Sequence, residues 1–408
     1  MGPLEGVRVV ELAHEYVAFA GRLLADLGAD VVLVEPPGGH PGRHFGPFVD
    51  DEPHPERSLW WWHHHASKRG VTLDLSAPNL DTLNLDDPAD RLRLRTLAAQ
   101  ADVVLEGEEP GWVGALLGER PERLIHVAIT PYGQAGDYPP VTDLTVLAAG
   151  GPVWSCGYDD HTLPPVRGGG NQGFQTACNY AVMSVLTALV AREQTGRGQF
   201  VDVSMHASCN VTTEFGSYTW LAAGHTVQRQ TGRHATPRPT EVTQVQCLDG
   251  RWLNTGVPPR TGREFQALGT WIEDLGLADE FDEFGVLQLG YEVDYIPVLN
   301  LEDDPLKAEI FGAGRSAIEF LAESLTGHDL FVGLQQRGMA CGIIYSPEEV
   351  LEDEHFKARG FPTQIEHEDL GRTITYPGSS LRFVGTPCGP HRRAPHVGEH
   401  NDEVLTGG

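Results

Sequence analysis

A glycine-rich turn before a long apolar segment is the first feature of the sequence able to bind a charged group. Gly168-Gly169-Gly170 follows Arg167 and leads through Asn171 and Gln172 into a stretch of helical character that ends near Glu193. Glycines allow backbone paths closed to other residues, and a helix N-terminus favours an anion. A carboxylate substrate facing Arg167, Asn171 and Gln172 fits this pattern, and so does a tight turn without a ligand.

Three tryptophans followed by three histidines, at 60–65, form the most unusual string in the chain. Histidine is a common metal ligand, and aromatic rings suit the wall of a substrate pocket. Neighbouring side chains of a strand or turn point in different directions, so three adjacent histidines rarely make one site. We therefore expect no metal here, and favour packing of the tryptophans against a sheet or a partner chain.

Short apolar strands alternate with helical patterns in the first third of the chain. Such alternation predicts an α/β fold with a mostly parallel, doubly wound sheet. A long helix is expected from about 172 to 193, and the pattern changes beyond about 240 towards a smaller unit. The expected strands are 7–12, 31–34, 71–75, 103–105, 124–130 and 200–204, and the first helices are 16–27 and 91–101.

The turn after the first strand lacks the glycines of a dinucleotide site. A GxGxxG pattern would bring a pyrophosphate against the helix N-terminus, but this turn reads Ala13-His14-Glu15-Tyr16. The carboxylate of Glu15 and the bulk of Tyr16 oppose such binding. A nicotinamide or flavin oxidoreductase is therefore disfavoured.

The bulk composition excludes several classes of partner. The formal net charge is −28, with 57 acidic and 29 basic residues, and such a surface repels nucleic acid and anionic membranes. The six cysteines are widely spaced without CxxC, and no secretory leader precedes Leu4. We therefore expect a cytoplasmic protein with reduced thiols that binds neither nucleic acid nor membrane.

Five motifs keep a fixed order along almost the whole chain. They are Pro3 to Val9, Leu24 to Val31 continuing into Val34 to Gly38, Ser67 to Leu75, Ala191 to Ser204, and Ala394 to His400. Together they resemble family III CoA-transferases, the group of formyl-CoA, carnitine and related transferases and of 2-methylacyl-CoA racemase. The order of the motifs carries the resemblance, since no single one is decisive.

The resemblance implies a fold that composition alone does not. Family members have a Rossmann-like, doubly wound α/β large domain formed by both chain ends and a smaller α+β middle domain, and two chains thread through each other as an interlocked dimer. We accordingly expect the large domain at 1–225 and 345–408, the small domain at 240–330, and linkers at 226–239 and 331–344.

The resemblance also implies a chemistry. Family members attack an acyl-CoA thioester with one aspartate, forming a mixed anhydride that the CoA thiolate then opens. The racemase branch uses a histidine and the same aspartate position as acid and base. Racemase chemistry is disfavoured in this chain because Thr142 stands just before Asp143, where that histidine would be.

The nucleophilic aspartate is missing from its expected position. In the family it starts the helix that ends at the motif around Glu193, and counting back without gaps reaches Phe174, between Gln172 and Gln175. No Asp or Glu occurs between Asp160 and Glu193, so a shifted alignment does not restore the acid. Neither a phenyl ring nor a neutral amide can form the anhydride.

The expected CoA site is altered as well. The family places Asn-Phe-x-Pro-Gly against the nucleotide part of CoA, where this chain has Glu106 to Gly111 with three carboxylates that repel a polyphosphate. The basic segment 228–234 is open to binding a CoA phosphate, contacting a partner, or being a solvated linker. The candidate substrate and CoA residues are His14, Tyr16, Arg43, Lys68, Arg69, Arg167, Asn171 and Gln172.

These departures lead to a hypothesis. Benzylsuccinate CoA-transferases resemble a pair of related chains in which only one carries the aspartate, and this chain resembles the other. It would be the non-catalytic subunit of a heteromeric enzyme that moves CoA between an acyl-CoA, such as succinyl-CoA, and a carboxylic acid. Its partner would be an aspartate-containing homologue or a second copy of itself.

Two alternatives stay open: an active CoA-transferase or other acyl-CoA enzyme that uses a different residue, and a binding or regulatory protein on the same fold. No tightly bound cofactor is expected, and a CoA thioester would be a substrate if the chain is active.

Overall fold

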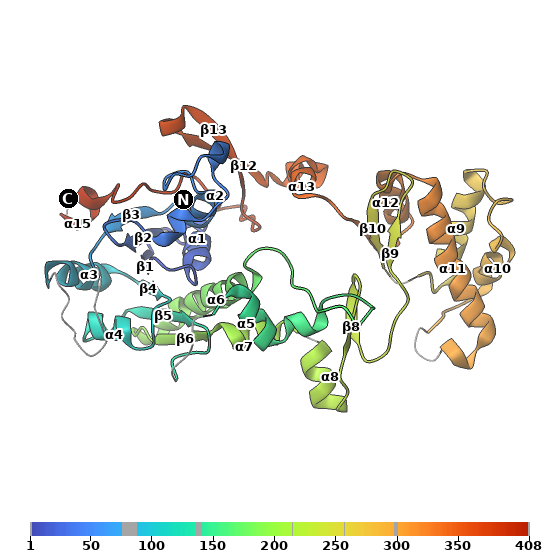
Figure 1. Cartoon of the computed structure of the whole chain (residues 1–408), viewed down its shortest axis with the longest axis horizontal. Helices are drawn as coiled ribbons and strands as arrows, with labels where there is room; N and C mark the ends of the chain where they lie inside the picture. Colours follow the sequence, from blue (N-terminus) through green and yellow to red (C-terminus); the bar gives the residue numbers. More distant parts are fainter. Residues whose placement is uncertain are drawn as a thin grey trace. The chain divides into compact units, whose positions relative to one another are not determined.

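The computed structural model describes residues 2–75, 88–135, 141–213, 215–256, 258–297 and 301–406. They form two compact units (Figure 1). The first unit contains both ends of the chain, in Met1–Cys156, Pro164–Thr226 and Leu351–Gly408, and the second contains Gly157–Leu163 and Val227–Val350.

A six-stranded sheet forms the centre of the first unit. Its strand order is β3-β2-β1-β4-β5-β6, and every neighbouring pair is parallel. The predicted α/β class and parallel sheet are therefore confirmed. The strands are β1 (Arg8–Leu12), β2 (Asp30–Glu35), β3 (Arg69–Thr72), β4 (Val103–Glu106), β5 (Ile125–Thr130) and β6 (Phe200–Ser204).

Helices cover both faces of this sheet, as its near-continuous apolar strands require. On one face, alternate residues of β4 and β5 pack with α1 and α6 in a core that includes Val103, Ile125 and Ala181. On the other face, α3, α4 and the C-terminal α15 pack around Val104. The helices of this unit are α1 (Ala18–Asp26), α2 (Leu59–His65), α3 (Pro88–Gln100), α4 (Trp112–Leu117), α5 (Asp143–Gly150), α6 (Gln172–Thr195), α7 (Met205–Val211), α8 (Phe215–Ala223), α14 (Glu354–Arg359) and α15 (Asn401–Leu405).

Helix α6 is the long helix that the sequence predicts. It ends at Gly196, whose φ of 74° is the left-handed conformation that glycine adopts readily at a helix C-terminus. Its length and composition would allow it to cross a membrane. The residues Phe174, Ala177, Ala181 and Val185 instead pack into the core against the sheet, which is the behaviour of a core helix.

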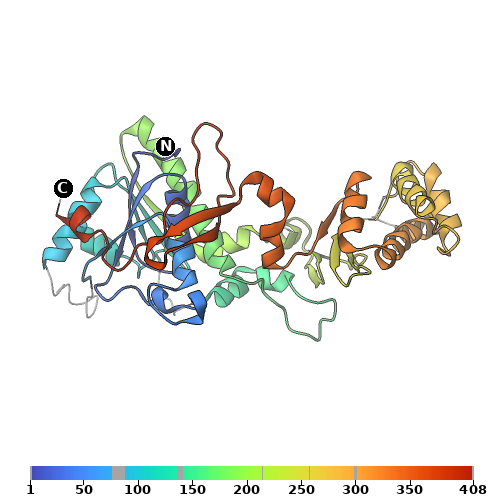
Figure 2. The same cartoon turned by 90° about the horizontal axis from the view of Figure 1, so that it is seen from above.

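The last part of the chain packs on the first. The hairpin of β12 (Pro362–His367) and β13 (Arg372–Pro377) is drawn in red in Figure 2. Its residues Tyr376 and His367 contact Trp62 of α2. Helix α15 then lies beside β3, where Asn401 Oδ1 accepts a hydrogen bond of 2.8 Å from the backbone N–H of Thr72.

The second unit has its own core. A three-stranded antiparallel sheet, in the order β11-β10-β9, packs with helices around Leu253, Phe265 and Leu321. Its elements are β7 (Gln228–Gln230), β8 (Arg233–Thr236), β9 (Gln244–Gln246), β10 (Trp252–Thr255), α9 (Gly262–Asp274), α10 (Phe284–Leu289), α11 (Pro305–Ser324), α12 (Gly327–Gln336) and β11 (Cys341–Ile343), and α13 (Pro347–Glu352) follows.

Candidate functional site

The chain reverses its progress across the sheet between β1 and β4. Doubly wound sheets bind ligands beyond the carboxyl ends of the strands at such a point. The chain leaves β1 through His14 and Tyr16, and leaves β4 through Gly107 and Glu108. Tyr16 contacts Phe174 in the first turn of α6, with ring centroids 4.9 Å apart. These three segments therefore form one candidate site.

Asp143 caps the first turn of α6 although it belongs to α5. Its Oδ1 accepts hydrogen bonds from the backbone N–H groups of Gly173 at 2.7 Å and Phe174 at 3.3 Å. The helix needs this outside partner because Asn171, at its N-cap, makes no capping bond with its side chain. An acid that the sequence places elsewhere thus lies at the mouth of the helix.

Arg167 completes the pairing of that acid. Its Nη1 donates to Asp143 Oδ2 at 3.1 Å and to the carbonyl of Gly170 at 2.6 Å. Both oxygens of a buried carboxylate are then held by donors, which stabilises the anion and weakens it as a nucleophile. The predicted substrate contact of Arg167, Asn171 and Gln172 stays a prediction, and in this structure the anion beside Arg167 belongs to the chain itself.

Replacing Asp143 with alanine should destabilise the first unit. The change removes the only described side chain that accepts from the first turn of α6, and loss of such a cap costs about 1–2 kcal/mol. Asp143→Asn keeps an oxygen acceptor and should lose less. Urea unfolding of both variants measures the difference, and equal losses would mean that the capping bonds are not the cause.

Aromatic rings fill the space between the β1 loop and α6. The rings of His14 and Tyr16 have centroids 4.2 Å apart, and Tyr16 meets Phe174 edge to face. Phe174 is only 4% exposed. Burial, with a smaller contribution from His40, lowers the pKa of His14 to about 4, so this imidazole is neutral at pH 7. Gln172 is exposed and Gln175 is half-buried.

The loop after β4 adds carboxyl groups to the same edge. Burial, followed by the nearby carboxylates of Glu106 and Glu109, raises the pKa of Glu108 to about 7. Glu106 is buried, and its Oε1 lies 3.3 Å from Nε2 of His126. The repulsion of a polyphosphate by this loop stays a prediction, and the structure shows that Glu106, Glu108 and Glu109 lie close to one another.

Lys68 and Arg69, two of the predicted cations, are paired with carboxylates. Lys68 is fully buried and donates to Glu11 Oε1 at 2.8 Å and to the carbonyl of Ala18 at 2.9 Å. Arg69 binds both oxygens of Asp30, at 2.9 and 2.6 Å. These contacts favour structural roles for both side chains over contact with a phosphate.

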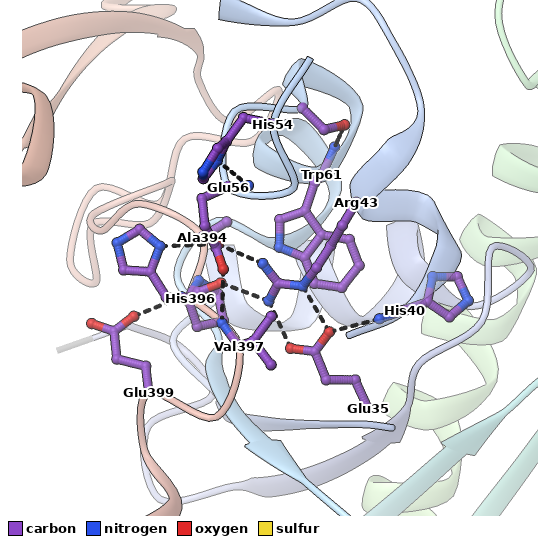
Figure 3. Close-up of polar contacts among 12 residues, drawn as sticks. Glu35, His40, Arg43, His54, Glu56, Trp61, Ala394, His396, Val397 and Glu399 are labelled. Carbon is purple, nitrogen blue, oxygen red and sulfur yellow. Dashed lines mark hydrogen bonds and ion pairs between the residues drawn. The ribbon is translucent and has the colours of Figure 1, made fainter. Parts of the chain in front are cut away.

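Arg43, the third predicted cation, lies at the centre of a buried network (Figure 3). It binds both oxygens of Glu35, at 2.8 and 2.6 Å, and Glu56 at 2.6 Å, and it stacks over Trp61 at 4.1 Å. Its Nη2 also donates to the carbonyl of Pro395 at 3.0 Å. The network is therefore a joint between the two ends of the chain.

The C-terminal segment is fixed to the same network. His396 Nδ1 lies 2.9 Å from Glu56 Oε2, and the backbone N–H of Val397 donates to Glu56 Oε1 at 3.2 Å. Arg393 and Glu399 form a bidentate pair beside them. The last of the five sequence motifs, Ala394 to His400, thus holds the C-terminal segment against Glu56.

The tryptophan and histidine string forms α2, so its six side chains spread around a helix. Trp61 contacts His65 with tilted rings whose centroids are 3.9 Å apart, and Trp60 stacks on His64 at 4.3 Å. Burial lowers the pKa of His63 to about 4 and that of His64 to about 3, so both are neutral at pH 7. Within the described ranges, no cluster of three or more His, Cys, Asp or Glu could hold a metal.

Two cavities lie away from the start of α6. One, of about 840 Å³, is lined by residues of the segments 119–122 and 191–199. The other, of about 380 Å³, lies beside Glu106, His126 and Phe200. Neither cavity is lined by His14, Tyr16 or Phe174.

The basic segment 228–234 is engaged within the second unit. Arg233 binds both oxygens of Asp159, at 3.2 and 2.6 Å, and Arg229 donates to the carbonyl of Leu163 at 2.8 Å. These bonds attach the β7–β8 hairpin to the segment 157–163. The guanidinium groups of Arg229 and Arg233, which the sequence offered to a CoA phosphate or a partner chain, are thus hydrogen-bonded within the second unit.

Comparison with known proteins decides the family. The model of CoA-transferase family III matches residues 4–283 and 294–401. The chain belongs to CoA-transferase family III.

Relatives of this family III chain include enzymes described with succinyl-CoA. It is 28% identical over 406 residues to the succinyl-CoA:(R)-benzylsuccinate CoA-transferase subunit BbsE of Thauera aromatica, covering 98% of this chain and 92% of that protein. It is also 28% identical to the succinyl-CoA–D-citramalate CoA-transferase of Chloroflexus aurantiacus, covering 99% and 93%. A CAIB/BAIF family protein from Brucella suis has the same fold, with a TM-score of 0.76, 24% identity and 99% coverage of both chains.

Membership of family III makes the start of α6 the place to compare with the nucleophile of other family members. CoA-transferases use CoA thioesters as substrates, and the position of the family's nucleophile at Phe174 stays a prediction. The structure brings Phe174, His14 and Tyr16 together and pairs Asp143 with Arg167. Asp143 is the residue that sequence reasoning missed as part of the site. Its signal was the acid-free stretch from 161 to 192, which leaves the helix without an acid of its own in the first turn.

Proposed function

We propose that this chain is the non-catalytic subunit of a heteromeric CoA-transferase. The complete enzyme moves CoA between an acyl-CoA, such as succinyl-CoA, and a carboxylic acid. A homologous chain that carries the aspartate supplies the nucleophile, and this chain completes the assembly and the surroundings of the acceptor.

The start of α6 is the observation that carries the proposal. Forming an acyl anhydride requires a carboxylate that can attack the thioester carbonyl. Phe174 offers a buried ring, and the buried Asp143 already accepts three of the roughly four hydrogen bonds that a carboxylate can accept. An acid held in this way serves the helix rather than the thioester.

The names of two relatives support a heteromer. Thauera aromatica BbsE is described as a subunit, and a succinyl-CoA–L-malate CoA-transferase of Chloroflexus aurantiacus, 27% identical, is described as a beta subunit. Both names also specify succinyl-CoA, which is why we propose it as the donor. We propose the interlocked arrangement of two chains, with the large domain at 1–225 and 345–408, as the form of the assembly.

The site of action that we propose is the cytoplasm. All six cysteines are free, with Cys178, Cys209 and Cys247 buried, as is usual in a reducing compartment. CoA and its thioesters enter as substrates, and the proposal needs no tightly bound cofactor.

Co-purification with the aspartate-containing homologue tests the proposal. The chain alone should transfer no CoA from succinyl-CoA to a panel of carboxylic acids, and the mixture should turn over. Changing the homologue's aspartate to alanine should abolish turnover of the mixture. Turnover by this chain alone, lost in Asp143→Asn, would replace the proposal with an active enzyme that uses Asp143.

A further inference from the structure

We propose that His14, Tyr16 and Phe174 form an aromatic plug that keeps the thiol-bearing arm of CoA away from the start of α6. This inference rests on the proposed function and adds to it a statement about ligand binding. A chain without a nucleophile could still hold CoA, whereas a plugged chain leaves CoA to its partner.

The half-buried rings of His14 and Tyr16 pack in series against the buried ring of Phe174. Tyr16 lies between the other two, with centroid distances of 4.2 Å to His14 and 4.9 Å to Phe174. Phe174 is 4% exposed, so the residues that the structure describes cover nearly all of its ring. An arm directed at this first turn of α6 would have to displace Tyr16.

The loop after β4 packs directly against two of the three rings. A Cβ placed on Gly107 would lie 3.0 Å from both Nδ1 of His14 and Cβ of Tyr16. Such distances mean that the backbone of this loop already touches both side chains. An arm that ran from the β4 loop to the helix start would therefore meet direct contact between the two segments.

Hydrogen bonds hold the plug in place. The backbone N–H of Tyr16 donates to Nδ1 of His14 at 3.2 Å, and the Cys178 thiol donates to the carbonyl of Tyr16 at 3.1 Å. Burial lowers the pKa of His14 to about 4 and raises that of Cys178 to about 12. At pH 7 the imidazole is therefore neutral and accepts, and the thiol is protonated and donates, so both bonds persist.

Equilibrium binding of two probes by the isolated chain tests the plug. CoA carries the arm, and 3′-phospho-ADP is the same nucleotide without it. We expect wild-type chain to bind the two with the same affinity, within twofold, or to bind neither detectably in calorimetric titration. Tyr16→Ser and the double variant His14→Ala/Tyr16→Ser should bind CoA at least tenfold more tightly than wild type, with 3′-phospho-ADP unchanged.

Phe320→Ser is the matched control. It removes a half-buried ring of α11 that stacks on Phe281 within the second unit, and it should change neither affinity. Circular dichroism and thermal melting establish that each variant is folded. The single Tyr16→Ser variant keeps the test available if the double variant fails to fold.

Two outcomes overturn the plug. One is wild-type binding of CoA at least tenfold tighter than 3′-phospho-ADP, and the other is a folded Tyr16→Ser variant that gains no affinity for CoA. Because no turnover is measured, either outcome leaves the non-catalytic role intact. Turnover by the chain alone would contradict that role instead.

Discussion

Arg43→Met is expected to lower the free energy of unfolding by about 3–5 kcal/mol, the usual cost of breaking a buried ion pair by removing one partner. Arg43 and Glu35 have side chains 1% and 0% exposed. The variant leaves the Glu35 carboxylate in the core without a counter-charge and removes one of the hydrogen bonds of Glu56. The stacking surface of Trp61 also loses its cation.

Urea unfolding of Arg43→Met beside Arg197→Met measures this effect. Arg197 pairs with Glu122 at 3.3 Å, but both side chains are more than 70% exposed, so its loss should leave stability near that of wild type. Limited proteolysis should also cleave the segment after His391 faster in Arg43→Met, because Pro395 loses its bond to Arg43. Equal stability of the two variants would mean that Arg43 is not the joint described above.

Lys68→Met is expected to lower the free energy of unfolding by about 3–5 kcal/mol at pH 8, as Arg43→Met does, and by less at pH 5. Burial raises the pKa of Glu11 to about 7 even with Lys68 beside it, and removing Lys68 raises that pKa further. The unfolded chain has a Glu11 pKa near 4.5, so the folded state binds the extra proton at intermediate pH. Raising the pH therefore favours unfolding by about 1.4 kcal/mol per pH unit, up to the folded pKa.

In wild type the loss of stability with rising pH stops near pH 7, where the folded state releases the Glu11 proton. In Lys68→Met the loss continues above pH 7. The difference in unfolding free energy between wild type and Lys68→Met should accordingly be larger at pH 8 than at pH 5. Lys307→Met removes an exposed lysine that pairs with Asp304 at 3.3 Å, and it should show no such dependence. A Lys68→Met penalty that is the same at both pH values would contradict the assigned coupling to Glu11.

The local pattern predicted most of the first unit. Short, mostly apolar runs identified β1, β2 and β5, and the apolar pattern before Gly196 identified α6 within two residues of its end. The hairpin of β12 and β13 was not predicted. Its inward residues, such as Ile365 and Tyr376, alternate with charged and polar ones, and what they pack against is Trp62, some 300 positions earlier.

The sequence indicated which segments of the chain form the candidate site, but not which charged side chains pair with one another. The strand ends and the helix start drew attention to His14, Tyr16 and the position of Phe174, and the fold brings these together. The pairing of Lys68 with Glu11 spans 57 positions, which no local pattern reveals. A signal was present all the same, because an acid inside a strand buried on both faces must find a counter-charge.

The joint around Arg43 has a consequence for synthesis on the ribosome. Its bond to Pro395 spans 352 positions of the chain, so Glu35, Arg43 and Glu56 emerge long before the segment that completes their hydrogen bonding. At about 5–20 residues per second, the wait is on the order of 20–70 s. During that interval the nascent chain carries an unfinished polar cluster, and the last step in forming that cluster waits until Pro395 has been synthesised.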